Sequence, residues 1–418
     1  MGKASLSFLL IVCIVLEGLC NTLFINDDEL YDVATASTTY FVVGILIALL
    51  PLMPTKAGTT WMISTRITKG ILFLGLGLIG LFLYVEASAV FEKVPVDYRW
   101  ADMLPIMKIM CERLVAGKSV YANIEQIWGG IEPIYLPAIW LPLLPATLME
   151  VDVRWTAMLL FMGALIFCVF TRPKSQLSRQ QHFRSILVLV PLIILVHHWM
   201  IYESRFFSMT EESIVVFYYL FLAYGIARKN PILIALGLSL CMLSRYSLAL
   251  WAVVYVLYEL VLGDRRAAFR IIWIGGSFSL FLLVVTQAIW HLDIFLGLPS
   301  NYLDAIVNEE HKFGALVQDG LGLAKFYEYD QLPRLNRLFL ISAISAPLLS
   351  FTIYHFFKSR LNKELFLLCS LKLTLVLFYN TLIMPFVYLF FTSTLFSIAI
   401  LNFYLNYDPS PSKTVQQA

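Results

Sequence analysis

The sequence has few charged residues and no long polar tract. Only 14% of its 418 residues are charged and 60% are hydrophobic, against about 45–50% apolar residues in an average soluble domain. The mean hydropathy is +0.79. This composition excludes a soluble globular protein. It predicts an all-α polytopic membrane protein, because a helix needs about 20 mostly apolar residues to cross a bilayer.

Cysteine and histidine show no pattern that would hold a disulfide framework or a metal ion. Five of the six cysteines lie inside apolar runs, and Cys111 alone falls in a polar segment. His197 and His198 are adjacent, with no third ligand at a helical spacing. We therefore predict neither a metal nor another cofactor. The net charge of +2 gives no indication of a nucleic-acid partner.

Twelve apolar runs are predicted to cross the membrane, with both termini in the cytoplasm. The first is interpreted as an uncleaved helix, because the segment around Glu17–Cys20 lacks the small residues of a signal-peptide cleavage site. The predicted spans are 5–24, 39–54, 70–90, 154–171, 186–200, 213–227, 231–244, 247–262, 271–290, 338–357, 364–381 and 384–404.

A thirteenth apolar run, 134–149, decides the sidedness of everything after it. Pro133 directly precedes the run, and Pro137, Pro142 and Pro145 lie inside it. Each proline removes a backbone N–H donor that lipid cannot replace. We therefore interpret this run as a re-entrant or interfacial element on the outer face.

If the run at 134–149 does not cross the membrane, lysine and arginine concentrate on one side of the membrane. Loops on that side hold only three acids, Asp264, Glu364 and Asp408, against a large group of cations. The positive-inside rule assigns that side to the cytoplasm. The cations are Lys3, Lys56, Arg66, Lys69, Arg172, Lys174, Arg179, Arg184, Arg228, Lys229, Arg265, Arg266, Arg270, Lys358, Arg360, Lys363 and Lys413.

Two long loops then lie outside, at 91–153 and 291–337, and both are rich in aromatic and acidic residues. We divide the chain into two N-terminal helices at 1–60, a central transmembrane module at 61–290 with the first outer loop, the second outer loop at 291–337, and C-terminal helices with a short tail at 338–418. Short loops and lean termini favour a bacterial inner membrane.

The first outer loop carries an ordered set of short motifs. These are VPVDYRWAD at 94–102, GKSVY at 117–121, EPIYLPAIW at 132–140 and DVRW at 152–155. Their order and sidedness resemble the first outer loop of GT-C glycosyltransferases that use polyprenyl-phosphate sugars, including bacterial mannosyltransferases and the lipid A aminoarabinose transferases. The resemblance covers roughly residues 70–290. In it, residues 1–60 are an addition to the common module.

The resemblance implies an inverting transfer of a sugar to a lipid, glycan or protein acceptor, with an aspartate as general base. Asp97 is the first candidate because it comes earliest after the span, and Asp102 is the second. A solvated face or a helix cap is the alternative interpretation of both. Arg245, in Ser244-Arg245-Tyr246, stands where the family often has a lysine, and a cation there can bind phosphate. Snorkelling to the interface is the alternative for Arg245.

Further candidates come from other polar segments. Arg205, His311 and Lys312 are candidates for binding the donor phosphate, although a solvated helix face also explains the charges around His311. Glu132, Tyr135, Glu203 and Glu212 are candidates for shaping the acceptor cavity. Arg154 and Arg205 would alternatively neutralise nearby acids.

One cation lies inside a predicted span. Lys372 must pair or face water, and Glu17 and Glu259 are the intramembrane acids available to it. A transporter or flippase of a lipid-linked saccharide, which would show such charges near the bilayer midplane, is the alternative function. An O-antigen ligase or polymerase is a third possibility. The concentration of ionisable groups on one outer face favours the enzyme.

Overall fold

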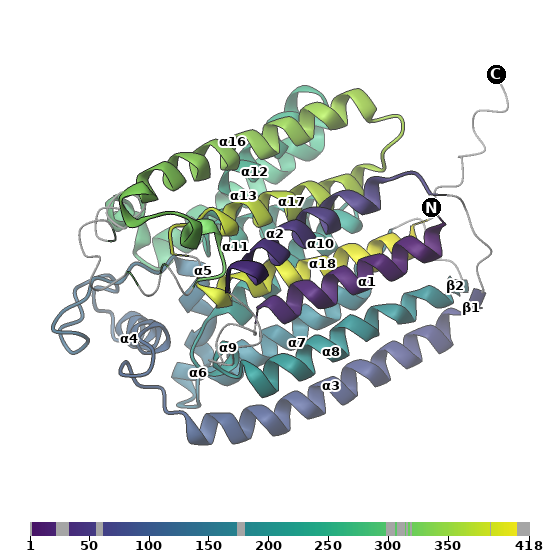
Figure 1. The fold of residues 1–418 in the computed structure, drawn as a ribbon. Coiled ribbons are helices and arrows are strands. Elements are labelled where there is room, and N and C mark those ends of the chain that lie inside the picture. Colours follow the sequence, from purple (N-terminus) through teal and green to yellow (C-terminus); the bar gives the residue numbers. More distant parts are fainter. Residues whose placement is uncertain are drawn as a thin grey trace.

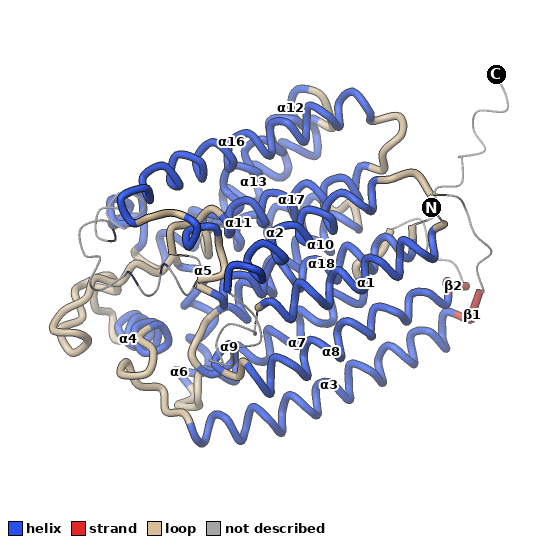
Figure 2. The backbone as a smooth tube through the Cα atoms, in the orientation of Figure 1, coloured by secondary structure: helices blue, strands red, loops and turns tan. Residues whose placement is uncertain are grey.

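The computed structural model describes residues 2–21, 33–55, 62–173, 180–297, 306, 314, 317, 320–384 and 386–407. In these ranges the chain forms a bundle of roughly parallel and antiparallel helices (Figures 1 and 2). The long helices are α1 (Lys3–Cys20), α2 (Val33–Leu49), α3 (Thr65–Lys93), α7 (Arg154–Phe170), α8 (Leu189–Tyr202), α10 (Glu212–Ala227), α11 (Pro231–Met242), α12 (Ala249–Val261), α13 (Arg265–Val285), α16 (Leu332–Phe357), α17 (Lys363–Asn380) and α18 (Phe390–Asn406).

Shorter elements lie at the ends of the bundle. The short α-helices are α4 (Met103–Val115), α5 (Pro137–Trp140), α6 (Leu144–Leu148) and α9 (Arg205–Ser208). The 3-10 turns are η1 (Leu50–Leu52), η2 (Leu141–Leu143), η4 (Phe183–Val188), η5 (Tyr246–Leu248), η6 (Ala288–His291), η7 (Leu323–Phe326), η8 (Tyr329–Gln331) and η9 (Val387–Leu389). One short pair of strands accompanies the helices and leaves the all-α class unchanged. Strand β1 (Met62–Ser64) pairs antiparallel with β2 (Gln180–His182), joining two loops through backbone hydrogen bonds.

Seven helical segments among the described residues are long and apolar enough to cross a membrane. This confirms a helical membrane protein. Other predicted spans are shorter. Helix α11 has 12 residues, or about 18 Å at 1.5 Å per residue, whereas the hydrocarbon core is about 30 Å thick. The count of twelve spans therefore stays a prediction.

The two ends of the bundle differ in character. One end holds the β1–β2 pair, the N-terminus of α1 and the C-terminus of α18, and Lys3 donates a hydrogen bond to the carbonyl of Tyr407 there. The opposite end holds α4, α5, α6 and α9 (Figure 1). We call the end with Lys3 and the β1–β2 pair the basic end, and the end with α4, α5, α6 and α9 the loop end. Elements predicted to share a membrane face therefore do lie at a common end of the bundle.

The apolar run at 134–149 is broken into the three short pieces α5, η2 and α6. A proline stands in the first turn of each piece, where its fixed φ suits a helix start and its missing N–H costs nothing. The run together has 12 helical residues from Pro137 to Leu148. Because the prolines restart the helix instead of letting it continue, the run stays at the loop end.

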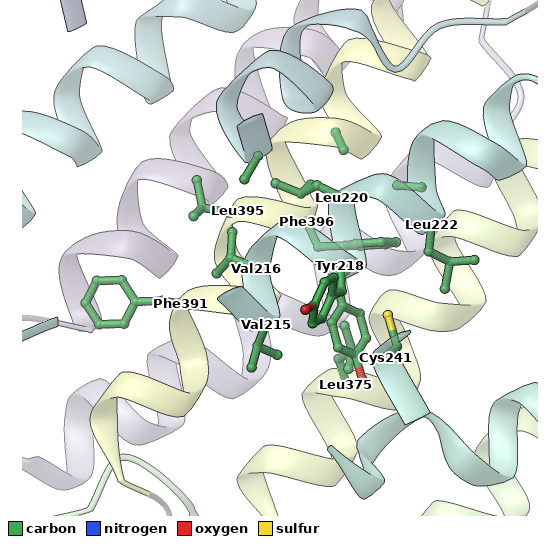
Figure 3. Packing of buried hydrophobic residues seen from close by; sticks show 14 of the residues in the cluster. Val215, Val216, Tyr218, Leu220, Leu222, Cys241, Leu375, Phe391, Leu395 and Phe396 are labelled. Carbon is green, nitrogen blue, oxygen red and sulfur yellow. The ribbon is translucent and has the colours of Figure 1, made fainter. Parts of the chain in front are cut away.

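Helices α10 and α18 form the centre of the bundle. Every residue of α18 is buried, and its apolar residues surround the helix, which is the pattern of a helix enclosed on all sides. Val216 and Leu220 of α10 lie near Leu395 and Phe396 of α18 in this core, whereas Leu222 lies on the side of Cys241 in α11 (Figure 3). By contrast, α3 and α13 leave large apolar side chains such as Phe73 and Trp273 exposed, as expected of helices that face lipid.

Candidate functional site

Arg245 occupies the turn between α11 and η5 at the loop end. Helix α11 ends at Met242, and Arg245 adopts an extended backbone that directs the chain into η5. Its Nη2 atom lies 2.8 Å from Glu211 Oε1 and 2.6 Å from Glu212 Oε2. Both glutamates are buried, and the Arg245 side chain is 15% exposed. The structure therefore places Arg245 in a buried ion-pair cluster, which excludes the snorkelling interpretation.

The glutamates are held at the start of α10. Glu211 is the N-cap residue and Glu212 the first helical residue, a position where the helix dipole favours negative charge. Thr392 of α18 donates a hydrogen bond to Glu212, and the guanidinium of Arg245 lies 5.8 Å from the centre of the Tyr388 ring. Three helix ends thus meet at this cluster.

Two polar atoms of the cluster have no partner among the described residues. They are Nε of Arg245 and Oε2 of Glu211, and both are buried. Burial acts to lower the pKa of Arg245, but the charges of Glu212 and Glu211 outweigh it and raise that pKa above its ordinary value. The arginine is therefore a permanent cation. The cluster offers one N–H donor and one carboxylate acceptor to an incoming molecule.

Tyr135 joins the broken apolar run to this cluster. Burial, followed by the negative charges of Glu211 and Asp102, raises the pKa of the Tyr135 phenol well above its ordinary value. The run is fixed by its backbone: Ala138 N donates to the carbonyl of Leu243 at 3.0 Å, and Tyr218 Oη donates to the carbonyl of Ala138 at 2.8 Å. These two bonds attach the run to α10 and to the residue that follows α11, close to Arg245 in the sequence.

The two aspartate candidates have different surroundings. Asp97 Oδ1 accepts a hydrogen bond from the backbone N–H of Arg99 at 2.9 Å, and its side chain is 34% exposed. Asp102 occupies the N-cap position of α4, yet its side chain makes no capping bond. The carboxylate of Asp102 is thus unused by its own helix and acts on Tyr135, whereas Asp97 is committed to its own turn.

Glu203 and Arg205 form a second pair at the loop end, between α8 and α9. Glu203 is buried, its Oε1 lies 3.3 Å from Arg205 Nε, and the Arg205 side chain is 49% exposed. Burial raises the pKa of Glu203 to about 7, although the charge of Arg205 acts in the opposite direction. Oε2 of Glu203 has no partner among the described residues. Arg205 therefore neutralises an acid, as the alternative interpretation held.

Arg154 holds the start of α7 against the end of α3. It pairs with Asp152, and its guanidinium donates to the carbonyls of Val94 and Phe91 at 2.6 and 2.9 Å. Phe91 lies in the last turn of α3 and Val94 directly follows the helix, where carbonyls lack intrahelical partners. Arg154 thus caps α3 and fixes the start of the first outer loop.

Of the remaining predicted residues, the structure describes Glu132 alone. Glu132 is exposed, and His311 and Lys312 lie outside the described residues. His197 stacks on Phe82 and His198 on Tyr202. In the described part of the chain, no group of three or more His, Cys, Asp or Glu side chains is placed to hold a metal ion.

Sequence reasoning missed part of the cluster. Glu211 is not among the residues predicted from the sequence. Thr392 and Tyr388 gave no signal, because hydroxyl-bearing residues are common inside apolar helices and at the membrane interface. Their role depends on α18 packing beside α10, which pairs residues 180 positions apart.

Comparison of the chain with protein-family models, with curated proteins and with solved structures gave no match.

Proposed function

We propose that this protein is an integral membrane glycosyltransferase of the GT-C type. It would move a sugar from a polyprenyl-phosphate donor to a lipid, glycan or protein acceptor on the non-cytoplasmic face. The configuration at the anomeric carbon of the sugar would be inverted. The observation that carries the proposal is the buried cluster of Arg245, Glu211 and Glu212 at the loop end, with Tyr135 and Asp102 beside it. These residues come from the segments that carry the resemblance and are far apart in the sequence.

The reaction needs a base and a cation. The acceptor hydroxyl gives its proton to a carboxylate while its oxygen forms a bond to the anomeric carbon, and the bond from that carbon to the phosphate oxygen breaks. The lipid phosphate leaves with the electron pair of the broken bond. A positive group at the leaving oxygen stabilises the charge that develops there.

The proposal assigns these roles to Asp102 and Arg245. The carboxylate of Asp102 makes no capping bond and is available to accept a proton. The free Nε of Arg245 is available to a phosphate oxygen. The carboxylates on its other face hold the guanidinium in place. Asp97, the first candidate from the sequence, becomes the second here, because its carboxylate already accepts a bond within its own turn.

The test is sugar transfer from radiolabelled polyprenyl-phosphate hexoses to endogenous acceptors, in membranes that contain matched amounts of each variant. We expect Asp102→Asn to lower transfer about 100-fold or more, the range for loss of a general base. Asp97→Asn and the exposed control Glu132→Gln should keep most of it. Loss in Asp97→Asn with activity retained in Asp102→Asn would move the base to Asp97.

The same preparation tests the alternative function. If wild-type protein transfers no sugar from any donor, yet moves labelled lipid-linked saccharide across reconstituted vesicles, the enzyme proposal is wrong and a flippase replaces it. Arg245→Lys keeps the charge but loses both Nη2, which contacts the two glutamates, and the unpartnered Nε. We expect it to reduce transfer more than tenfold while the protein still purifies as a single species.

A further inference from the structure

A second polar site lies at the basic end, where the proposed reaction has no use for it. A pocket of about 760 Å³ opens between the end of α10 and the starts of α11 and α13. Its wall contains three cations, Arg228, Lys229 and Arg270, and no carboxylate. The rest of the wall is formed by Tyr224, Asn230, Pro231, Ile232, Leu233 and Ile274.

The positive charge of this pocket is poorly neutralised. Lys229 pairs with Glu364 at 2.8 Å. Arg228 lies over the Tyr224 ring, 5.5 Å from its centre, and neither Arg228 nor Arg270 has a carboxylate partner in the described part of the chain. An uncompensated pair of guanidinium groups in a concave surface attracts an anion.

A buried arginine stands beside the pocket and adds to its charge. Arg172, just after α7, is 8% exposed, and its Nη2 has no hydrogen-bond partner among the described residues. Burial, followed by the charge of Arg228, lowers the pKa of Arg172, while Tyr224 acts in the opposite direction. Two arginines that repel each other, one of them buried with a free donor, form an arrangement that a bound anion would stabilise.

The arginines, and not the helix terminus, provide the anion contacts. The N–H groups of Ile232 and Leu233 in the first turn of α11 already donate to Asn230 Oδ1. A phosphate would therefore bind guanidinium groups, which match its oxygens in a bidentate manner. Apolar surface adjoins this position, since Ile232 in the wall is 50% exposed and Leu233 and Ile274 also line the pocket.

We infer that this pocket, which we call the basic pocket, binds the phosphate headgroup of an anionic phospholipid. Its arginines hold the phosphate, and the exposed apolar surface of α11 and α13 carries the acyl chains. Basic pockets between transmembrane helices on the cytoplasmic side are suited to anionic lipid headgroups. The exposed apolar residues at its edge favour a lipid over a free phosphate, which would gain nothing from them.

The experiment measures binding of phosphatidylglycerol to the purified full-length protein in neutral detergent, with phosphatidylcholine and inorganic phosphate as separate arms. The test variant is Arg228→Gln/Arg270→Gln. The control is Arg265→Gln/Arg266→Gln, which removes the same charge from exposed positions at the same end. We expect the test variant to lose phosphatidylglycerol affinity about tenfold or more and the control less than about threefold.

Equal losses in the two variants would overturn the inference, because they would reflect general surface charge alone. Inorganic phosphate binding as tightly as phosphatidylglycerol would overturn the choice of a lipid. If the double variant fails to fold, Ile232→Cys replaces it. Ile232 lines the basic pocket, whereas all six native cysteines are buried. Phosphatidylglycerol should slow maleimide labelling of the introduced thiol severalfold and phosphatidylcholine should not, and equal rates would again contradict the inference.

Discussion

Glu203 is a residue whose ionisation should affect stability. Its pKa in the folded protein is about 7, above the ordinary value of 4.5, because the side chain is buried. Between these values the folded state binds the proton more tightly than the unfolded state, so stability falls as pH rises through this window. Above pH 7, this difference between the folded and unfolded pKa lowers the free energy of unfolding by on the order of 3 kcal/mol. Glu203→Gln should therefore raise the thermal unfolding midpoint by a few degrees at pH 8 and by much less at pH 5.

The exposed residue Glu132 provides the matched control. Glu132→Gln removes the same charge where no burial acts on it, so its effect should be small at both pH values. Arg205 is half exposed and stays solvated after Glu203 is neutralised. A Glu203→Gln effect of equal size at pH 5 and pH 8 would show that packing, and not ionisation, changes the stability.

The sequence predicted those site residues whose charge is unusual for their surroundings. Arg245 and Glu212 stand out because ionisable groups at the ends of apolar helices are costly unless they are used or paired. Which of Asp97 and Asp102 accepts a local hydrogen bond could not be predicted, since it depends on the backbone N–H groups beside each carboxylate. The partner of Lys372 was left open between Glu17 and Glu259. The structure pairs Lys372 with Glu17 and Glu259 with Lys363.

Helix α18 is the element on which the rest of the bundle depends. Besides its apolar contacts, Asn402 Nδ2 contacts the carbonyls of Cys168, Val169 and Thr171 at 3.0, 2.7 and 3.1 Å. These carbonyls lie at the C-terminal end of α7, where intrahelical partners are absent. Asn402→Asp keeps the shape but directs a carboxylate at three carbonyl oxygens, and we expect it to destabilise the protein by about 3 kcal/mol or more.

Asn402→Leu separates the two causes of that loss. It removes the donor without adding a charge, so its cost should be about 1–3 kcal/mol, the penalty for unsatisfied buried carbonyls. Thermal unfolding in one detergent, with monodispersity checked by gel filtration, measures both variants. If Asn402→Leu is as destabilising as Asn402→Asp, charge repulsion is not the reason.

Elements were predicted well where apolar runs are long and poorly where contacts between loops form them. The run at 134–149 is interrupted as its prolines indicated, and α11 begins at the predicted residue 231 with Asn230 as its cap. The β1–β2 pair was not predicted. Its strands have three residues each and show no alternation of apolar and polar residues, so they pair only because the bundle brings the two loops together.

At the scale of the whole molecule, helices α1 and α2 belong to the bundle. Lys372 of α17 donates to Glu17 of α1 and to the carbonyl and hydroxyl of Ser393 in α18. Ser397 donates to the other oxygen of Glu17 at 2.8 Å. Both charged side chains are fully buried. This network connects α1 to α17 and α18, so this N-terminal helix is an integral part of the core.

A double-mutant cycle tests whether this pair holds the two ends of the chain together. Glu17→Gln or Lys372→Met alone leaves a buried charge without its partner, and each should cost about 3–5 kcal/mol. The double variant leaves no charge, so it should be more stable than either single variant, with a coupling energy of at least about 2 kcal/mol in thermal or denaturant unfolding. Glu259→Gln, which breaks the partly exposed pair with Lys363, should cost less than either. Losses that simply add in the double variant would mean that the pair does not couple the segments, and the N-terminal helices would then be held by apolar packing and by their other hydrogen bonds.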